Sequence, residues 1–505
     1  MVFTSAIFIF GFLPVVLAGF WLIAAAGGSA RHAVLWLLLA SLAFYAWWHP
    51  PHLALLLLTL SVNYAFGEVL KRYPRKAILV AGIAFNLLFI GYFKYLDFLI
   101  STVAGVTGQP LTPLNIVMPL AISFFSFQQI AYLTDTYRGQ STAPDFIEYC
   151  LFLTFFPHAI AGPLMHHRDI IPQFHARQFP HVTREDLIVG LIIFLIGFNK
   201  KVVVADSIAT IANPVFDTAV ASPPGAVDAW AGALAYTFQI YFDFSGYSDM
   251  AIGLARMFGL KLPINFDSPY RATSIIEFWR RWHITLSRFL RDYLYMPLGG
   301  NRQGQVKRYI NLMIVMLLGG LWHGAGWTFV IWGGVHGLYL VINHAWIAIR
   351  GTLVPAALQG TPYGTLLARG LTFAAVVVAW VFFRAENIDT ARALLSGMAG
   401  LNPGATALVD PAALPWLAVL LLVVWVAPNT QELMARHAPA LYFENRPSSR
   451  SDSAPRAAQV DRVRAALSWR PAYWLVPFIS GTVVIAALLA HARGVISTQF
   501  IYMIF

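Results

Sequence analysis

Apolar runs separated by short polar breaks recur along the whole chain. A helix needs about 20 apolar residues to cross the hydrocarbon core of a bilayer, and most of the runs come close to that length. The runs lie at residues 3–26, 34–48, 53–66, 78–93, 116–133, 187–204, 230–254, 327–349, 366–383, 414–426 and 474–490. This pattern predicts an all-α polytopic membrane protein with about eleven transmembrane helices.

Residues 152–174 interrupt the pattern. The segment FLTFFPHAIAGPLMHHRDIIPQF contains three prolines, and four of its residues are His or Arg. Such backbone is tolerated at membrane depth only when it is buried in protein or lines a cavity. We therefore expect a re-entrant or broken helix here. A shorter polar interruption at residues 199–201 divides the run at 187–204.

The composition supports a membrane protein and excludes several other classes. The chain is 58% hydrophobic and 11% charged, whereas soluble domains carry about 25% charged residues. The net charge of +11 lies in loops between apolar runs, which fits the cytoplasmic bias of Lys and Arg better than nucleic-acid binding. The basic segments at 71–76 and 436–470 are therefore expected to be cytoplasmic, with the N-terminus outside. A single cysteine, Cys150, excludes an internal disulfide.

A segment rich in arginine and tryptophan lies at residues 277–293. On a helix of about 100° per residue, apolar side chains share one arc and arginines another. The apolar arc holds Trp279, Trp282, Leu286, Phe289, Leu290 and Tyr293, and the basic arc holds Glu277, Arg280, Arg281, Arg288 and Arg291. This division predicts one interfacial helix. His283 and Ser287 fall on its boundary, where a protein group can meet a polar substrate. We therefore predict that Ser287, the four arginines and the tryptophans Trp279, Trp282 and Trp322 bind the substrate or donor.

The positive charge around this helix suggests the chemistry of a donor. Residues 271–308 contain eight basic residues against Glu277 and Asp292. Guanidinium groups bind phosphates in a bidentate manner, so a nucleotide-bearing donor such as coenzyme A is a natural ligand. The alternative is that the arginines hold the helix to anionic lipid headgroups.

A second histidine, His323, ends an apolar run inside the sequence GGLWHGAG. Dense glycines let the chain bend and let backbones approach closely, so this histidine should face the protein interior, with Trp322 beside it. A neutral imidazole can accept a proton and return it, which is typically worth ~10²–10⁴ in rate. The alternative is a hydrogen-bonded packing residue, and this is how we interpret His336 in WGGVHG.

Two carboxylates, Asp243 and Asp249, lie inside the apolar sequence YFDFSGYSDMAIG. Intramembrane carboxylates are costly and are therefore candidates for a functional site. The alternative is a structural ion pair, with Arg256 or an arginine of the central segment. No metal site is predicted, because no H-E-x-x-H motif occurs and His166 and His167 are adjacent, so they cannot share one helix face. G-x-S-x-G and P-loop motifs are also missing from the sequence.

Four of these segments together resemble the membrane-bound O-acyltransferase family. They are FFPHAIAGPLMHHRDIIPQF, FDFSGYSDMAIG, FWRRWHITLSRFLRDYLYMPLGGNR and GLWHGAGWTFVIWGGVHG. The resemblance is greatest to the bacterial branch that includes the alginate O-acetyltransferase membrane subunit and the D-alanyl-transfer protein of teichoic acids. It implies that His323, in the W-H-G motif, is catalytic and that His283, in the R-W-H motif, is the second polar group.

The resemblance also implies a fold and a partner. The family forms a multi-helix ring around a thin, funnel-shaped centre with a tunnel for acyl groups. Its bacterial branch works with an extracytoplasmic acetyltransferase that carries a Ser-His-Asp site. The family pattern ends in F-I-Y-F-x-F, whereas this chain ends QFIYMIF, so Met503 departs from it. The alternative for this end is a hydrophobic tail at the membrane face.

These observations combine into one prediction of organisation and function. We expect a single membrane-embedded domain over 1–505, with N-terminal helices at 1–140, a catalytic core at 141–350, and C-terminal helices at 351–505 that include a mobile loop at about 436–470. The protein is expected to be a multi-pass O-acetyltransferase of the bacterial inner membrane. A cytosolic thioester, acetyl-CoA, would supply the acetyl group, with no permanently bound cofactor.

The expected acceptor is an extracytoplasmic polysaccharide such as alginate or cellulose. The expected partners are the Ser-His-Asp acetyltransferase, a polysaccharide synthase complex and membrane lipid, with no nucleic acid. His323 would act as general base or transient acyl carrier, and His283 would orient the donor carbonyl or stabilise an oxyanion. The alternatives are D-alanyl or other acyl transfer from a carrier protein, an export channel, and a scaffold without enzymatic activity.

Overall fold

The computed structural model describes residues 1–160, 162–353, 361–403 and 408–442. Within these ranges the regular structure is helical, apart from one isolated β-bridge between Pro263 and Leu441. This confirms the predicted all-α class. The predicted helix at 474–490, nearly all of the expected mobile loop, and the QFIYMIF tail lie outside the described residues.

The first part of the chain forms a series of apolar helices, three of which run directly on from a π-helical turn or into one. These elements are η1 (Phe8–Phe12), α1 (Leu13–Ala25), α2 (Ala30–Ala46), α3 (Pro50–Arg72), α4 (Lys76–Ile90), η2 (Gly91–Tyr95), α5 (Leu96–Thr107), α6 (Ile122–Tyr137), α7 (Phe146–Thr154) and α8 (His167–Phe174).

The middle of the chain combines long helices with the short helices of the arginine-rich segment. These elements are α9 (Arg184–Asn199), η3 (Lys200–Ala205), α10 (Asp206–Asp217), α11 (Ala226–Met257), η4 (Pro269–Arg271), α12 (Ile275–Arg281), α13 (Ile284–Leu290), η5 (Arg291–Tyr295), α14 (Gln305–His323) and α15 (Trp327–Leu353). The last described elements are α16 (Pro362–Arg384), α17 (Ile388–Met398), α18 (Ala413–Val426), α19 (Thr430–Leu433) and η7 (Ala435–His437).

Five helical segments of the described chain are long and apolar enough to cross a membrane, and two shorter helices are similarly apolar. The long segments are Phe8–Ala25, Pro50–Arg72, Lys76–Thr107, Arg184–Asp217 and Pro362–Arg384, and the shorter ones are Ala30–Ala46 and Ala413–Val426. The protein is therefore a multi-pass membrane protein. The total of about eleven spans stays a prediction.

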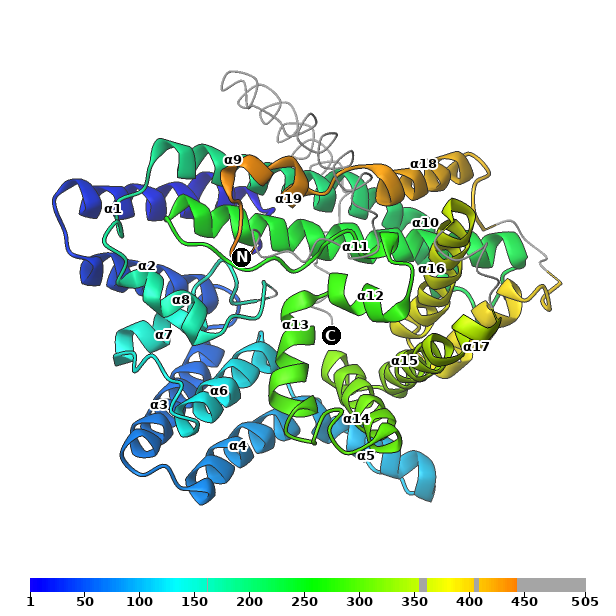
Figure 1. Ribbon diagram of the computed structural model, residues 1–505, viewed down its shortest axis with the longest axis horizontal. Coiled ribbons are helices and arrows are strands. Elements are labelled where there is room, and N and C mark those ends of the chain that lie inside the picture. Colours follow the sequence, from blue (N-terminus) through cyan, green and yellow to red (C-terminus); the bar gives the residue numbers. More distant parts are fainter. Residues whose placement is uncertain (161, 354–360, 404–407, 443–505) are drawn as a thin grey trace.

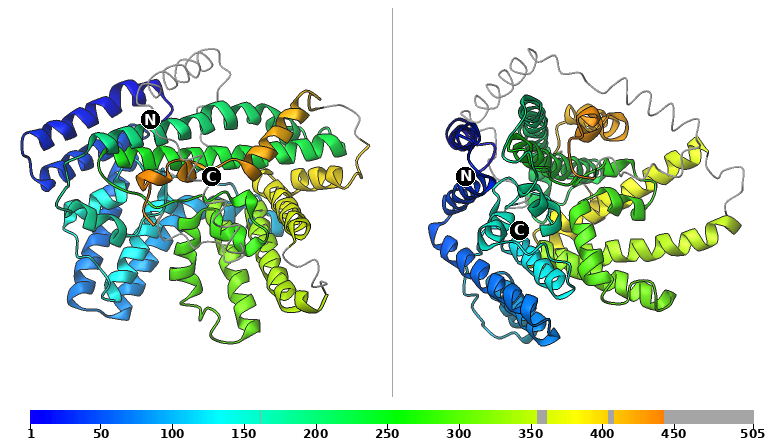
Figure 2. Two further views of the ribbon diagram at one scale, coloured as in Figure 1. Left: turned by 45° about the horizontal axis from the view of Figure 1, so that its top comes forward. Right: turned by 60° about the vertical axis from the view of Figure 1, so that its left-hand side comes forward.

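The helices surround the short pair α12 and α13, which lies near the middle of the molecule (Figure 1). The helices α1 to α4 and α6 follow one side of this arrangement, α14 to α18 follow the other, and α5 extends toward α14 (Figure 1). Figure 2 shows from two further directions that α9 and α11 run beside each other. The ring-like arrangement agrees with the fold that the family resemblance implied, whereas a continuous tunnel through it stays a prediction.

Close backbone contact between α9 and α11 makes a rigid scaffold. A Cβ atom added at Gly190 would lie 2.6 Å from the carbonyl oxygen of Gly253, and one added at Gly246 would lie 2.7 Å from that of Gly197. Both distances are shorter than side chains tolerate. The glycines are seven residues apart on both helices, so they recur on one face of each. Small residues of this kind let membrane helices pack closely.

Three helix boundaries differ from the sequence predictions. The run predicted to end at residue 93 continues through η2 and α5 to Thr107. Lys94 does not end the helix, because its ammonium finds hydrogen-bond acceptors inside the protein. The run predicted to begin at residue 116 begins at Ile122, after a non-helical segment. Residues 199–201 do not break their helix, since η3 joins α9 to α10 as a π-helical turn.

The prediction for residues 152–174 agrees with the structure. α7 ends at Thr154 and α8 begins at His167, and the described residues between them, which exclude residue 161, are not helical. Phe155, Phe156 and His158 in this irregular segment are almost completely buried. The irregular backbone is therefore enclosed by protein, as membrane depth would require.

Candidate active site

His323 is the last residue of α14, at a sharp turn toward α15. Gly324 follows with extended backbone angles and ends the helix, and Trp327 begins α15. A Cβ atom at Gly320 would lie 3.1 Å from the Cα atom of Gly333, so the two helices touch backbone to backbone. The glycines expected from the sequence thus hold the α14–α15 pair together and set His323 toward the interior.

His283 lies at a break that the sequence analysis did not predict. The single interfacial helix expected at 277–293 is wrong, because α12 ends at Arg281 and α13 begins at Ile284. His283 between them has a positive φ of 44°. At this break a residue distant in sequence satisfies the backbone. The carbonyl oxygen of Asn265 accepts a hydrogen bond from the backbone N–H of Ile284 at 3.0 Å.

The side chain of Asn265 also sets the orientation and tautomer of His283. Its Oδ1 accepts from the backbone N–H of Thr285 at 3.3 Å and from the Thr285 hydroxyl at 2.9 Å, and it lies 3.1 Å from Nδ1 of His283. A carbonyl oxygen only accepts, so Nδ1 of the imidazole carries the proton. Nε2 then holds a lone pair. In this tautomer His283 can accept a hydrogen bond at Nε2, whereas it cannot donate one to an oxyanion.

The two histidines approach each other inside an aromatic enclosure. Their ring centroids are 6.3 Å apart. His283 is fully buried and His323 is 5% exposed. Phe244 meets the ring of His283 at 4.8 Å, and Trp332 and Phe383 meet that of His323 at 5.1 and 5.2 Å. Burial in such surroundings favours neutral imidazole, which is the form that can act as a base.

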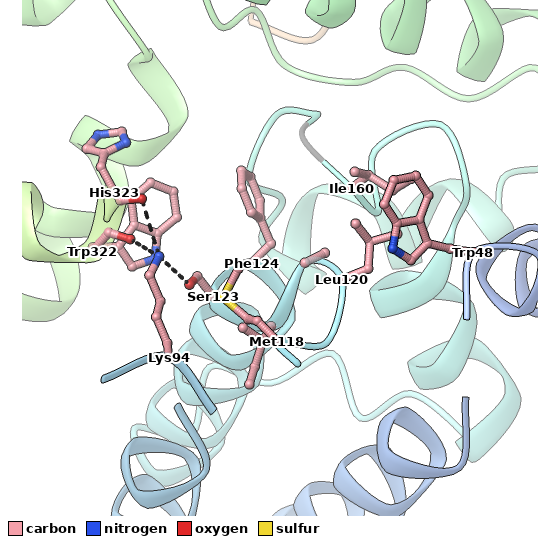
Figure 3. Close-up of a pocket in the computed structure, with 11 residues that line it drawn as sticks. Trp48, Lys94, Met118, Leu120, Ser123, Phe124, Ile160, Trp322 and His323 are labelled. Atoms are coloured by element: carbon pink, nitrogen blue, oxygen red, sulfur yellow. Dashed lines mark hydrogen bonds between the residues drawn. The ribbon is translucent and has the colours of Figure 1, made fainter. Parts of the chain in front are cut away.

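A cavity of about 260 Å³ reaches His323. Apolar side chains form most of its wall, and Figure 3 shows Met118, Leu120 and Phe124 between His323 and Trp48. Its full lining is Trp48, Lys94, Met118, Leu120, Ala121, Ile122, Ser123, Phe124, Ile160, Trp322 and His323. The candidate base therefore lies at the end of a largely apolar pocket that contains one cation.

That cation, Lys94, was missed by the sequence analysis. Its ammonium donates to the carbonyl oxygens of Trp322 at 2.6 Å and His323 at 3.3 Å, and to the Ser123 hydroxyl at 3.2 Å (Figure 3). The apolar run was predicted to end at Phe93, which placed Lys94 in a loop. An ionisable residue within a long apolar helix is a signal that could have identified it.

Three tryptophans, Trp279, Trp282 and Trp322, were predicted to bind the substrate or donor, and their positions in the structure differ. Trp322 lines the cavity and stacks on Phe127 at 5.4 Å. Trp279 is half-buried and contacts His336 at 5.1 Å. Trp282 is 1% exposed and stacks on Phe278, so it belongs to the protein core. Fully buried His336 lies among these rings, which agrees with its predicted packing role.

The predicted arginines do not share one helix face, because the break at His283 separates them. Arg281 pairs with Glu277 at 2.8 Å, and Arg291 pairs with Asp292 at 2.7 Å. Arg288 lies 3.8 Å from Asp169. Arg280 is exposed on α12. Ser287, the other residue predicted at the boundary, is half-buried, and its hydroxyl lies 3.5 Å from the carbonyl of Trp282.

Asp243 and Asp249 form ion pairs, as the alternative interpretation expected. Their partners are lysines rather than arginines: Lys201 lies 2.7 Å from Asp243, and Lys200 lies 2.6 Å from Asp249. The expectation of Arg256 as partner is wrong, because Arg256 pairs with Asp186. The lysines become the partners because η3 packs directly against α11 and places both ammonium groups beside these carboxylates.

A polar cluster occupies the other end of α6, twelve residues beyond Ser123. The Tyr293 hydroxyl donates to Asp135 at 2.9 Å and lies 3.1 Å from Nδ1 of His166, and Arg168 lies 3.3 Å from the same carboxylate. Twelve residues of helix span about 18 Å. The cavity, which reaches His323, and this polar cluster therefore lie at opposite ends of α6.

Comparison with known proteins defines the class. A model of the MBOAT, membrane-bound O-acyltransferase, family matches residues 114–355. The chain is 42% identical to the peptidoglycan O-acetyltransferase of Helicobacter pylori over 435 residues, which is 80% of each chain. It is 41% identical to the probable alginate O-acetylase AlgI of Pseudomonas aeruginosa over 408 residues, 79% of this chain and 75% of that protein.

A more distant relative is the teichoic acid D-alanyltransferase of Streptococcus thermophilus. It is 28% identical over 252 residues, 46% of this chain and 59% of that protein. From the family match and the two longer alignments, the chain belongs to the membrane-bound O-acyltransferase family. It is an acyltransferase, and this favours the enzymatic prediction over an export channel or a scaffold.

Proposed function

We propose that this protein transfers an acetyl group from acetyl-CoA in the cytosol to an extracytoplasmic polysaccharide, from a position in the bacterial inner membrane. The observation that carries the proposal is the His283–His323 pair at 6.3 Å, with a cavity that reaches His323. The relatives named O-acetyltransferases or O-acetylases are 39–43% identical, which supports an acetyl group over D-alanine.

His323 acts as general base in this mechanism. Its neutral imidazole takes the proton from the acceptor hydroxyl while the hydroxyl oxygen attacks the thioester carbonyl carbon. The C–S bond then breaks, the acetyl ester forms, and the imidazolium returns its proton to the thiolate. Nε2 of His283 accepts a hydrogen bond and orients the hydroxyl, which replaces the oxyanion role suggested by the sequence.

The direction of transfer follows from where the basic residues lie. α14 begins beside Lys307 and Arg308 and ends at His323, and 19 helical residues span about 28 Å. α4 likewise begins at Lys76, beside the basic segment at 71–76, and leads to Lys94 at the cavity. Because basic loops favour the cytoplasm, the cavity belongs to the far side, where the acceptor or a partner would enter.

The donor, acceptor and partners complete the proposal. Arg280 and Arg288, with Arg281 and Arg291 as neighbours, attract the phosphates of coenzyme A. The acceptor is an exopolysaccharide such as alginate or cellulose, and the names of the relatives add peptidoglycan to this class. An extracytoplasmic acetyltransferase with a Ser-His-Asp site and a polysaccharide synthase complex act beside the protein.

The test compares two histidine variants in cells and in isolated membranes. His323→Ala is expected to lower acetyl transfer from radiolabelled acetyl-CoA by ~10²–10⁴, because general-base help is lost, while the protein stays folded. The matched control His32→Ala removes an exposed histidine of α2 and is expected to keep the wild-type rate. A normal acetyl content of the polysaccharide in cells with His323→Ala would remove the catalytic role.

A further inference from the structure

Lys94 brings a positive charge into the interior of an apolar helix, next to the candidate base. It lies on the π-helical turn η2, within the apolar segment Lys76–Thr107, and it lines the cavity beside His323. π-Helical turns inside α-helices occur often at functional sites. The side chain is half-buried, and its ammonium binds the Trp322 carbonyl at the wall of the cavity.

The partners of Lys94 fit the ammonium form of its side chain. Three oxygen atoms surround the nitrogen, and two of them are backbone carbonyls that can only accept hydrogen bonds. An ammonium has three donors and matches this set. Among the described residues no carboxylate forms an ion pair with Lys94. The nearest acid in sequence, Asp97, instead accepts from the backbone N–H groups of Leu114 and Ile116 at 2.7 and 2.9 Å.

Lys94 binds the carbonyl oxygens of Trp322 and His323, which are the last two residues of α14. The last carbonyls of a helix carry partial negative charge, and a cation there is stabilising. Lys94 therefore restrains the turn from which the His323 side chain departs. Figure 3 shows the imidazole pointing away from Lys94, so the ammonium acts on the ring through the backbone and through its electrostatic field.

We propose that Lys94 is a positioning residue for the acyl transfer. Its ammonium holds the last turn of α14, and its positive charge adds to the effect of burial in keeping the imidazole of His323 in the neutral form that accepts a proton. This inference rests on the proposed role of His323 as general base. A nearby cation disfavours a second positive charge, so Lys94 extends the pH range over which the base is active.

The other groups around His323 do not replace this effect. Its titratable neighbours include His283, His336 and Lys94, and its ring also contacts Trp322, Trp332 and Phe383. His283 and His336 are fully buried and burial favours their neutral forms. Lys94, as an ammonium, is therefore the one of these three neighbours that brings a positive charge to the ring.

The experiment measures pH–rate profiles for the full-length protein in membranes, with radiolabelled acetyl-CoA as the probe. Lys94→Met should lower the rate by about 10²-fold and move the acidic limb to higher pH by about one unit, since loss of the cation makes imidazolium easier to form. Lys94→Arg keeps the charge and should restore the position of the limb. Ser123→Ala removes one acceptor of the ammonium and should leave the limb in place.

A second measurement requires no donor. Diethyl pyrocarbonate modifies neutral imidazole, so the pH dependence of modification of the His323 peptide, read by mass spectrometry, reports the protonation of this ring. The midpoint should move to higher pH by about one unit in Lys94→Met. If wild-type membranes transferred no acetyl group, the proposed function would fail while this measurement still tested Lys94.

Several outcomes would overturn the proposal. The first is an acidic limb of the pH–rate profile and a midpoint of His323 modification that both stay at the wild-type pH in folded Lys94→Met. The others are a shifted acidic limb in Lys94→Arg, or no modification of His323 in the wild-type protein. If Lys94→Met did not fold, as judged by size-exclusion chromatography, Lys94→Gln and Lys94→Arg would replace it with the same criteria.

Discussion

Two π-helical turns bring lysines into the interior of this protein, and the surroundings of the two charges differ. On η3, Lys201 is 4% exposed and lies 2.7 Å from both Asp206 and Asp243. On η2, Lys94 is half-buried and binds two carbonyls and a hydroxyl beside the cavity. The first charge is balanced by carboxylates of the scaffold, whereas the second is directed at the place where the reaction would occur.

This difference separates structural charge from functional charge. A buried ion pair that is fully hydrogen-bonded holds its helices in one arrangement, and removal of one partner leaves an uncompensated charge. A cation that binds only neutral oxygens is not neutralised by a carboxylate, so its electrostatic field acts on a nearby ligand or titratable group. The comparison therefore predicts that changes at η3 affect folding first, and that changes near η2 affect the reaction first.

The largest expected effect is at Lys201. Lys201→Met would leave the carboxylates of Asp206 and Asp243 buried without their cation, and breaking such a pair costs about 3–5 kcal/mol. We expect little folded protein in the membrane and a much lower thermal-unfolding midpoint by size-exclusion chromatography. Lys201→Met combined with Asp243→Asn should recover part of the loss. A stable, active single variant would contradict the structural role of this ion-pair network.

The sequence was sufficient to predict the all-helical membrane class, the broken segment at 152–174 and the turn at His323. These features depend on local composition: apolar runs, prolines and glycines specify them without reference to the rest of the chain. The ion pairs of Asp243 and Asp249 were also expected as an alternative. The identity of the partners was not, because it depends on how η3 packs against α11.

Two features of the site depend on contacts distant in sequence. His283 sits at a break because Asn265 binds the backbone there, and helical periodicity contains no information about such a contact. Lys94 was placed in a loop because charge usually ends an apolar run. Its partner Trp322 is 228 positions away in sequence, so only the folded structure shows that the ammonium is satisfied inside the protein.

A matched pair of glycines sharpens the comparison. Gly197 packs α9 on α11, where an added Cβ would meet the carbonyl of Gly246, and Gly320 packs α14 on α15, where it would meet that of Phe329. Substitution by alanine at either position should cost about 1–3 kcal/mol through overpacking. Only Gly320→Ala displaces His323, so it alone should lower the acetyl-transfer rate per folded molecule, by about tenfold or more.

The measurement is the thermal-unfolding midpoint together with the rate normalised to folded protein. Similar losses of stability with a selective loss of rate in Gly320→Ala would support the division between scaffold and site. Equal losses of normalised rate in both variants would show that the α9–α11 packing also determines the geometry at His323, and the division would then be wrong.

The smallest expected effect concerns the arginines, whose charges are satisfied to different extents. Arg291 binds Asp292 through two hydrogen bonds of 2.7 and 3.1 Å, whereas exposed Arg280 forms no ion pair with a described residue. An arginine without a carboxylate is available to phosphate. Arg280→Gln should therefore raise the KM for acetyl-CoA by about threefold to tenfold at unchanged kcat.

The matched control is Arg291→Gln, which should change the KM by less than about twofold, because an exposed ion pair contributes little. The difference should shrink at high ionic strength, where exposed charges are screened. Equal KM values for both variants would favour the lipid-headgroup alternative for these arginines.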